Sequence, residues 1–215
     1  GMVGNNSSGS TSIKYGVTRD KILQLEGYLS DGTPVTFGPL NPDELRAKTE
    51  LETLEGDIYR HLLMRFSASD VQEQIRANYP SPSLHRRNNG YAIDDLIQMA
   101  PFNPDGPPLN LCRLLAGSEG TLFFTTRIKL QLDPLPPVES ALLCPHFHSI
   151  GASMEAVSAI MKKEPDACEL MDRIVLDCTR ENRMYHPYRT FIEGDPEAVL
   201  MIELRAHTAE QLQQK

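Results

Sequence analysis

A proline-rich segment, Asp133-Pro134-Leu135-Pro136-Pro137, separates two stretches of sequence with different patterns. Proline fixes its own φ angle and lacks a backbone N–H, so closely spaced prolines interrupt regular structure and often mark a domain boundary. The 215 residues suffice for one large domain or two small ones, each with a hydrophobic core. We therefore predict one domain over residues 1–137 and a second over residues 138–215.

Alternation of apolar and polar residues predicts an antiparallel sheet in the first domain. Residues 22–29 carry leucine at alternate positions, and Ser30-Asp31-Gly32-Thr33 is typical of a hairpin turn before residues 35–37. Residues 121–132 alternate in the same way and predict a third strand. The leucines expected on one face of the first strand are Leu23, Leu25 and Leu29.

Helix signals lie between these strands. The run Asn41-Pro42-Asp43-Glu44 predicts a helix start, and apolar residues at steps of three and four predict an amphipathic helix over residues 51–66. The run Ser69-Asp70-Val71-Gln72 has the form of a capping box and predicts a shorter helix that ends before Pro80. The proline-rich stretch that follows is expected to be irregular, apart from a short helix over residues 94–99.

The second domain is expected to mix strands and helices in a unit of βαβ type. Its patterns predict a strand over residues 140–143, helices over residues 153–163 and 167–179, and a strand over residues 198–204. Thr208 is expected to cap a further helix. A unit of this kind would continue beyond Lys215, which suggests that the sequence is truncated.

Charge and cysteine usage restrict the function. The net charge of −8 argues against a general nucleic-acid binder, which needs a basic surface. No apolar run is long enough to span a bilayer, and the start shows no signal-peptide pattern. The cysteines are too widely spaced for a zinc knuckle or an iron–sulfur motif, so we predict a cytoplasmic protein with reduced, mostly buried thiols. They are Cys112, Cys144, Cys168 and Cys178.

Two glycine-bounded loops could carry chemistry. In Gly4-Asn5-Asn6-Ser7-Ser8-Gly9, glycines permit close approach of the backbone to a ligand, and Asn and Ser add donors for an anion. Taken alone, the composition of this loop favours a flexible N-terminal tail. In Gly117-Ser118-Glu119-Gly120, followed by Thr121, the main chain could lie along a dinucleotide, but an isolated loop of this kind is usually an ordinary turn.

The motifs taken together resemble those of the FAD-linked oxidases of the vanillyl-alcohol-oxidase type, which have a PCMH-type FAD-binding domain. This group includes D-lactate, glycolate and D-2-hydroxyglutarate dehydrogenases and alkyl-dihydroxyacetone-phosphate synthase. The resemblance covers most of residues 1–137 and, more loosely, the opening of the substrate or cap domain, best at residues 167–172. The order and spacing of the motifs make it specific; they are residues 1–9, Lys14-Tyr15-Gly16, residues 25–33, residues 87–96 and residues 115–122.

The resemblance implies an α+β fold, namely the second subdomain of a PCMH-type FAD-binding domain, with an antiparallel sheet and flanking helices, followed by the start of an α/β cap domain. It implies FAD as cofactor, with a full site that needs residues upstream of this chain. The expected cofactor-binding residues are Gly4, Asn5, Asn6, Ser7, Ser8, Gly9, Tyr15, Gly16, Gly117, Ser118, Glu119, Gly120, Thr121, Leu122, Phe123, Phe124 and Thr125. Phe123 departs from a small glycine usual in the family, and Thr126-Arg127 replaces a common Thr-Glu.

The implied reaction is oxidation of a 2-hydroxy acid, in which a base of the cap domain takes the hydroxyl proton while hydride passes to the flavin. Long members of the family add a downstream iron–sulfur domain. This chain alone is expected to be inactive, and the catalytic base is not assigned. Two alternatives stay open: a truncated, non-catalytic module, and a relative with other chemistry, such as alkyl-dihydroxyacetone-phosphate synthase.

A few polar residues are weaker candidates. Arg86, Arg87 and Arg180 could hold a substrate carboxylate, although a solvated surface role is commoner for arginine. His146-Phe147-His148 would place two imidazoles on one side of a strand, but a solvent-facing loop is the stronger interpretation. We predict no metal site in this chain.

Overall fold

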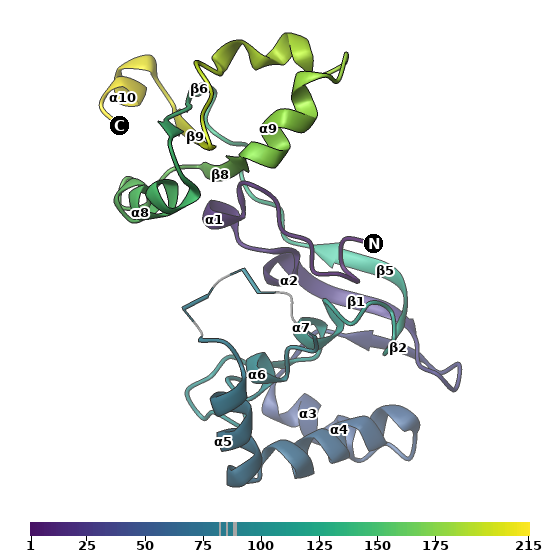
Figure 1. Ribbon diagram of the computed structural model, residues 1–215. Helices are drawn as coiled ribbons and strands as arrows, with labels where there is room; N and C mark the ends of the chain where they lie inside the picture. The colour runs from purple at the N-terminus through teal and green to yellow at the C-terminus, as the bar shows by residue number, and fades with distance from the viewer. Residues whose placement is uncertain (82, 85, 88–89) are drawn as a thin grey trace. The chain divides into compact units, whose positions relative to one another are not determined.

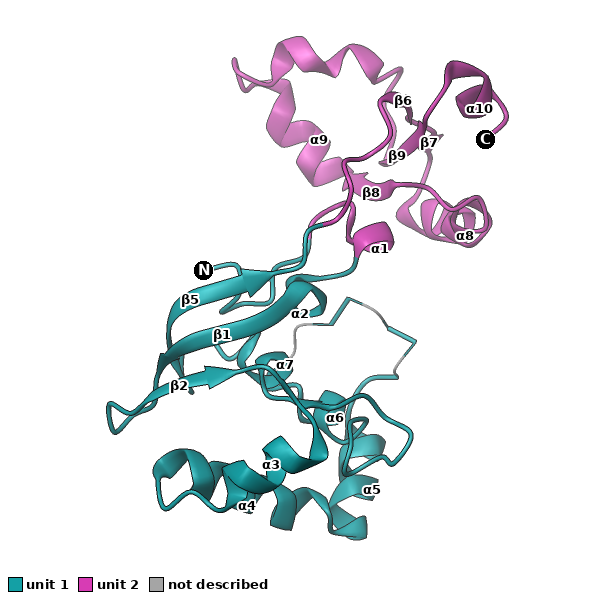
Figure 2. Ribbon diagram, turned by 180° about the vertical axis from the view of Figure 1, so that it is seen from behind, with its two compact units in different colours: residues 1–8, 16–132 teal, residues 9–15, 133–215 magenta. Residues whose placement is uncertain are grey.

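The computed structural model describes residues 1–81, 83–84, 86–87 and 90–215, and these form two compact units (Figures 1 and 2). Unit 1 comprises residues 1–8 and 16–132. Unit 2 comprises residues 9–15 and 133–215, so its longer part begins within the proline-rich segment. No helix in the described part of the chain is both long enough and apolar enough to cross a bilayer.

Unit 1 is built on a three-stranded antiparallel sheet. The strand β1 (Ile22–Tyr28) lies in the middle, between β2 (Pro34–Phe37) and β5 (Phe124–Leu130). The Asp31 carboxylate accepts hydrogen bonds from the backbone N–H and the hydroxyl of Thr33, at 2.9 and 2.8 Å, and so closes the hairpin turn. The predicted hairpin and the pairing of the third strand are confirmed.

One face assignment in β1 is wrong. Leu23 is 40% exposed, whereas Ile22 and Leu25 on either side of it are buried. The register against β5 shifts between Ile22 and Gln24, which marks a β-bulge. A bulge adds a residue to one strand and reverses which side chains face the core, so strict alternation could not place Leu23 correctly.

Helices cover one side of this sheet. Both views place α3, α4 and α5 on the same side (Figures 1 and 2). The elements of unit 1 besides the sheet are α2 (Thr18–Lys21), β3 (Pro39–Leu40), α3 (Pro42–Thr49), α4 (Leu54–Phe66), α5 (Ser69–Asn78), α6 (Ile93–Leu96), β4 (Leu109–Asn110) and α7 (Cys112–Leu115). Asn41 caps α3 in a complete capping box with Glu44, as predicted.

Two helix predictions need correction. The helix expected over residues 51–66 begins only at Leu54, because Thr53 caps it, and Leu51 lies outside at the break after α3. The capping box at Ser69 does not form, because Ala68 is the N-cap and Ser69 is already the first helical residue. Gln72 instead donates its side-chain amide to the Phe66 carbonyl, at 2.7 Å.

The core of unit 1 lies between the sheet and the helices. Leu25 and Phe37 from the sheet belong to the same buried cluster as Tyr59 of α4, Leu96 of α6 and Cys112 of α7. Burial of these large side chains is the main favourable term in folding the unit. Cys112 is the only buried cysteine; Cys144 and Cys168 are half-buried and Cys178 is exposed, so the prediction of mostly buried thiols is wrong.

Unit 2 is a four-stranded antiparallel sheet with helices. The central strand is β9 (Ala198–Ala206), and each of its residues is buried or half-buried. It pairs on one edge with β6 (Glu139–Leu143) and β7 (His146–Phe147), and on the other with β8 (Ala167–Asp172). The strands β6 and β8 are therefore parallel to each other, with β9 running antiparallel between them. The two parallel strands are thus not adjacent, and the unit is a split βαβ unit instead of a βαβ unit with neighbouring parallel strands.

The helices of unit 2 are α1 (Ser12–Tyr15), α8 (Ile150–Met161), α9 (Arg173–Arg180), a 3-10 helix over residues 186–191 and α10 (Ala209–Gln213). Thr208 caps α10, as predicted. The helix expected over residues 167–179 is wrong in its first half, which is β8. Six residues of β8 pair with β9, and Asp172 caps α9 by accepting from the Val175 N–H at 2.9 Å. Sheet pairing overrides the helical propensity of this segment.

A buried carboxylate ties the segment of residues 9–15 to the rest of unit 2. Asp166 is 1% exposed, and its carboxylate pairs with the Lys14 ammonium and accepts from the Arg205 backbone N–H at 2.7 Å. Burial opposes ionisation of Asp166, but these hydrogen bonds and the charge of Lys14 outweigh it and lower its pKa.

We expect Asp166→Asn to lower the free energy of unfolding at pH 7 by about 1.5–3 kcal/mol, the usual range for a hydrogen bond to a charged group. A carboxyl whose pKa is lowered by folding stabilises the protein above its unfolded pKa, near 3.9, and loses that contribution as pH falls through the lower folded value. The variant should therefore show a flatter loss of stability in acid, measured by denaturant unfolding. Glu155→Gln, at an exposed site on α8, is the control. Equal pH profiles for the two variants would contradict this role.

Candidate functional site

The two glycine-rich loops meet in unit 1. The Glu119 backbone N–H donates to the Gly4 carbonyl at 2.8 Å, and the Gly117 N–H donates to the Val3 carbonyl at 3.0 Å. These two segments, about a hundred residues apart in the sequence, therefore lie side by side. Neither loop is an isolated turn, because the first loop supplies the carbonyl acceptors and the second loop supplies the N–H donors of these hydrogen bonds.

Asn6 holds the first loop from within. It is fully buried, with a left-handed φ of +49°, and its side-chain oxygen accepts from the Arg19 backbone N–H at 2.7 Å. Asparagine tolerates this conformation better than most residues. Residues 1–20 thus form hydrogen-bonded turns and two short helices, and the flexible-tail interpretation is wrong.

Arg19 connects the two loops and was missed by sequence reasoning. The side chain is 5% exposed and donates from Nη2 to the Ala116 carbonyl, at 2.8 Å, directly before Gly117. Its Nε has no hydrogen-bond partner among the described residues. Burial lowers the pKa of Arg19, and the nearby Asp95 carboxylate partly offsets that effect. A single arginine in the run Thr18-Arg19-Asp20-Lys21 carries no sequence signal of burial.

A cavity of about 310 Å³ opens beside the meeting loops. Its wall includes Gly4 from the first loop, Ser118 and Gly120 from the second, and the start of β5. Within the described residues, the backbone N–H groups of Gly4 and Gly120 donate no hydrogen bond. Gly120 has φ +73°, and no atom lies within 4 Å of the position its Cβ would take. Unpaired backbone donors beside open space suit an anionic or carbonyl-bearing ligand.

The structure brings together only part of the predicted cofactor-binding set. The predicted residues that line the cavity are Gly4, Ser118, Gly120, Phe123, Phe124 and Thr125. Others contact these from behind or beside them: Thr121 donates its hydroxyl to the Ser118 carbonyl at 2.6 Å, and Gly117 and Glu119 pair with the first loop. Leu122 is 40% exposed next to Phe123.

The rest of the predicted set lies outside the cavity wall. The Ser7 hydroxyl donates to the Asn5 side chain at 2.6 Å, and Ser8 is exposed. Gly9 and Tyr15 belong to unit 2, whereas Gly16 begins the longer part of unit 1. Among the described residues that line the cavity, none comes from the Lys14-Tyr15-Gly16 motif.

The two departures from the family pattern are accommodated. Phe123 is buried and packs edge-to-face against Phe37, with ring centroids 5.0 Å apart. Gly27 on β1 leaves room for this ring, because a Cβ there would lie 2.9 Å from it. Arg127 forms a cross-strand ion pair with Glu26, at 3.1 Å. The larger side chain at Phe123 is thus mostly buried in the hydrophobic core of unit 1.

The predicted substrate arginines are engaged in ion pairs where the structure describes their partners. Arg87 pairs with Asp94 and, at 2.7 Å, with Asp95. Arg180, in unit 2, pairs with Asp177 and Asp195 at 3.2 and 3.1 Å. Arg86 is exposed, and the neighbouring residues 88 and 89 lie outside the described residues. A substrate carboxylate at Arg87 or Arg180 would have to compete with these aspartates.

The two histidines of the predicted pair differ in their surroundings. The His146 Nε2 accepts from the Glu193 backbone N–H at 3.0 Å, so its Nδ1 is the atom that donates to the Cys144 carbonyl at 2.7 Å. The His146 imidazole thus connects the backbone at Cys144 with the backbone at Glu193, whereas His148 is exposed. Among the described residues, no cluster of three or more His, Cys, Asp or Glu side chains is placed to hold a metal ion.

Comparison with known proteins finds related enzymes. Residues 135–215 match the family of FAD linked oxidases, C-terminal domain. A D-2-hydroxyglutarate dehydrogenase of Pantoea ananatis is 27% identical over 94% of this chain and 19% of its own length. The glycolate oxidase subunit GlcD of Escherichia coli is 34% identical over 46% of this chain and 19% of its own length. The chain thus spans about a fifth of the length of the curated relatives it matches.

One solved structure, described as alkyldihydroxyacetonephosphate synthase, aligns with 95% of this chain and 28% of its own. The sequence identity is 14% and the TM-score 0.46.

Proposed function

We propose that the chain is part of an FAD-dependent oxidoreductase that oxidises a 2-hydroxy acid, and the match of residues 135–215 to the FAD linked oxidases, C-terminal domain, supports this. The observation that carries the proposal is the meeting of the loops at Gly4 and Gly120 beside one cavity. The relatives named D-2-hydroxyglutarate dehydrogenase, which match nearly the whole chain, support a 2-hydroxy acid as substrate.

In this proposal the chain forms one side of the cofactor site. The backbone N–H groups of Gly4 and Gly120 would donate to FAD, and Arg19 would keep the two loops at a fixed separation from behind. FAD, when bound, supplies the hydride acceptor. The residues of this chain bind and orient; Arg86, Arg87 and Arg180 stay candidates for holding the substrate carboxylate. The four free cysteines agree with a reducing compartment, and we place the protein in the cytoplasm.

A pair of glycine variants tests the cofactor site. Gly120 and Gly32 both have left-handed φ angles, +73° and +83°, and both face open space. Alanine at either position should therefore cost a similar strain, about 1–2 kcal/mol. Only Gly120 lines the cavity, so we expect Gly120→Ala to weaken FAD binding about tenfold and Gly32→Ala to leave it unchanged. Equal effects of the two variants on the dissociation constant would count against the proposed site.

We expect the 215-residue chain, purified alone, to carry little FAD and to show no 2-hydroxy-acid dehydrogenase activity. Association costs roughly 4–15 kcal/mol of translational and rotational freedom, and the two loops contact only part of a dinucleotide. A flavin absorbance spectrum of the purified chain measures this directly. A stoichiometric yellow complex of micromolar affinity would show that the chain contains a far more complete site.

A further inference from the structure

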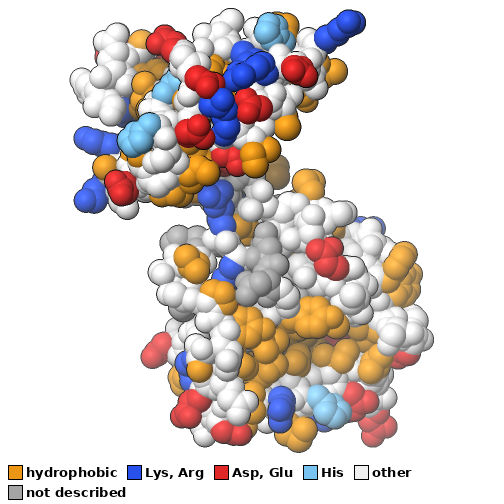
Figure 3. All heavy atoms as spheres, in the orientation of Figure 1, with side chains coloured by type: hydrophobic (Ala, Val, Ile, Leu, Met, Phe, Trp, Pro, Cys, Tyr) orange, Lys and Arg blue, Asp and Glu red, His pale blue; other side chains and the backbone are white. Residues whose placement is uncertain are grey.

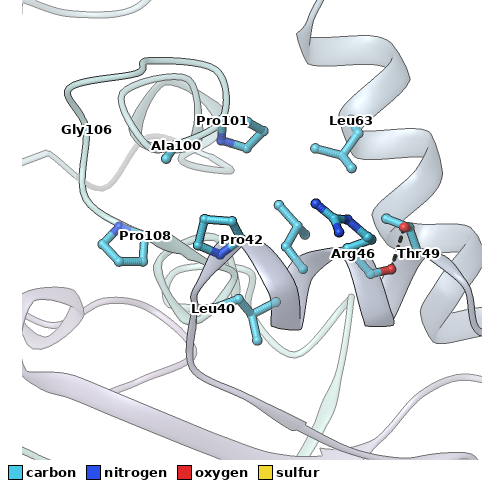
Figure 4. A pocket seen from close by; sticks show the side chains of 10 residues that line it. Leu40, Pro42, Arg46, Thr49, Leu63, Ala100, Pro101, Gly106 and Pro108 are labelled. Atoms are coloured by element: carbon cyan, nitrogen blue, oxygen red, sulfur yellow. Dashed lines mark hydrogen bonds between the residues drawn. The ribbon is translucent and has the colours of Figure 1, made fainter.

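A second cavity, of about 410 Å³, lies in unit 1 between α3, α4 and the turn over residues 100–108 (Figure 4). Its wall shares no residue with the cavity beside the glycine-rich loops. A volume of this size falls in the range of pockets that hold small molecules. Unit 1 therefore has a candidate binding site separate from the proposed cofactor site.

The wall of this cavity is mostly apolar. Hydrophobic side chains also gather on the face of unit 1 that carries α3 and α4 (Figure 3). Water in contact with such a wall is readily displaced by an apolar ligand. The apolar residues on which the argument rests are Leu40, Pro42, Leu45, Leu63, Pro101 and Pro108.

One cationic side chain lies among the apolar residues that line this cavity. Arg46 carries the only charge among the lining residues, and its guanidinium points toward Leu63 (Figure 4). Among the described residues the Arg46 guanidinium makes no hydrogen bond, and its ion pair with Asp43 spans 4.0 Å between two largely exposed side chains. An exposed pair of that length contributes little, so the guanidinium keeps its donors available.

We propose that the cavity binds a straight-chain monocarboxylic acid of about eight carbons, with the carboxylate on Arg46 and the chain among the leucines and prolines. If each ligand atom takes about the 30 Å³ of a liquid water, the cavity holds roughly 13 such atoms. Octanoate, with its two oxygens, fits within that limit.

The charges favour a carboxylate over a phosphate. A single guanidinium matches a carboxylate through two parallel hydrogen bonds. A phosphate monoester carries close to two negative charges at neutral pH and would meet Asp43 beside its one cation. A monoanion with an apolar body is therefore the class of ligand that the wall complements.

Titration calorimetry of the 215-residue chain with octanoate tests the proposal. We expect saturable binding that weakens about tenfold or more in Arg46→Gln, because a charge-assisted hydrogen bond is lost. Hexanoate should bind roughly 15-fold more weakly than octanoate, since each of the two buried CH₂ groups contributes about fourfold. 1-Octanol should bind wild type and Arg46→Gln equally.

Arg65→Gln is the matched control. Arg65 is also an exposed arginine on a helix of the same unit, but it does not line the cavity. Its substitution should leave octanoate binding unchanged. Three results would overturn the proposal: no heat at roughly 5 mM octanoate, where a Kd of about 1 mM is readily detected; equal affinity for octanoate and octanol; or equal weakening by the two arginine substitutions. Both substitutions are at exposed helix positions, so far-UV circular dichroism should confirm an unchanged fold.

Discussion

Replacing Asn6 by alanine is expected to lower the free energy of unfolding of unit 1 by about 2–5 kcal/mol. Two costs add. Alanine at a left-handed φ of +49° is strained by about 1–2 kcal/mol. The buried Arg19 backbone N–H also loses its acceptor, at a cost of about 1–3 kcal/mol. Urea unfolding followed by circular dichroism measures the change.

The neighbouring residue provides the control. Asn5 is exposed, and its side chain only accepts from the Ser7 hydroxyl. Asn5→Ala should change stability by less than about 0.5 kcal/mol, as most surface substitutions do. Asn6→Asp keeps both an acceptor and tolerance of the left-handed region, so it should recover much of the loss. If Asn5→Ala and Asn6→Ala were equally destabilising, Asn6 would not be what holds the first loop.

Replacing Gly27 by alanine should destabilise unit 1 by about 3 kcal/mol. The added Cβ would overlap the carbonyl oxygen of Phe124 and lie 2.9 Å from the Phe123 ring. Overpacking of a core typically costs about 1–3 kcal/mol, and here the obstacle is backbone of the paired strand rather than a flexible side chain. The same shift would move β5 where it lines the cavity, so weaker FAD binding should accompany the loss of stability.

Gly38→Ala is the matched control for this prediction. At Gly38 the nearest atom to an added Cβ is the Leu23 carbonyl oxygen at 3.6 Å, an ordinary contact, and the φ angle is not left-handed. Alanine there should be neutral or slightly stabilising, because it restricts the unfolded chain. Thermal unfolding of the two variants measures the difference, and equal stability of Gly27→Ala and Gly38→Ala would contradict the prediction.

The sequence predicted best the elements whose signals are local. The Asn41 capping box, the turn at Asp31 and the caps at residues such as Thr208 each involve neighbours along the chain, and all are confirmed. The capping box at Ser69 is a local signal that failed, but the larger errors lie in segments whose structure depends on partners distant in the sequence. The bulge that exposes Leu23 depends on pairing with β5, and β8 is a strand because it pairs with β9.

The sequence predicted which loops form the candidate site, but it did not predict the buried residues that support those loops. Glycine-rich loops and their family resemblance pointed to Gly4 and Gly120, and the structure brings these residues to one cavity. The support behind them could not be read from the sequence. Burial of Asn6 and Arg19 follows from long-range packing, and neither residue type is usually buried.

The central claim is that the two loops together contact FAD, and backbone amide NMR during FAD titration tests it most directly. Weak binding suffices, because at roughly 5 mM FAD a site with a Kd of about 1 mM is mostly filled. We predict concerted, saturable shifts at the amides of Gly4, Gly120 and their neighbours, with the hairpin turn at Gly32 unaffected. Saturable shifts elsewhere with these amides unmoved, or no shift at any of them at that concentration, would contradict the claim.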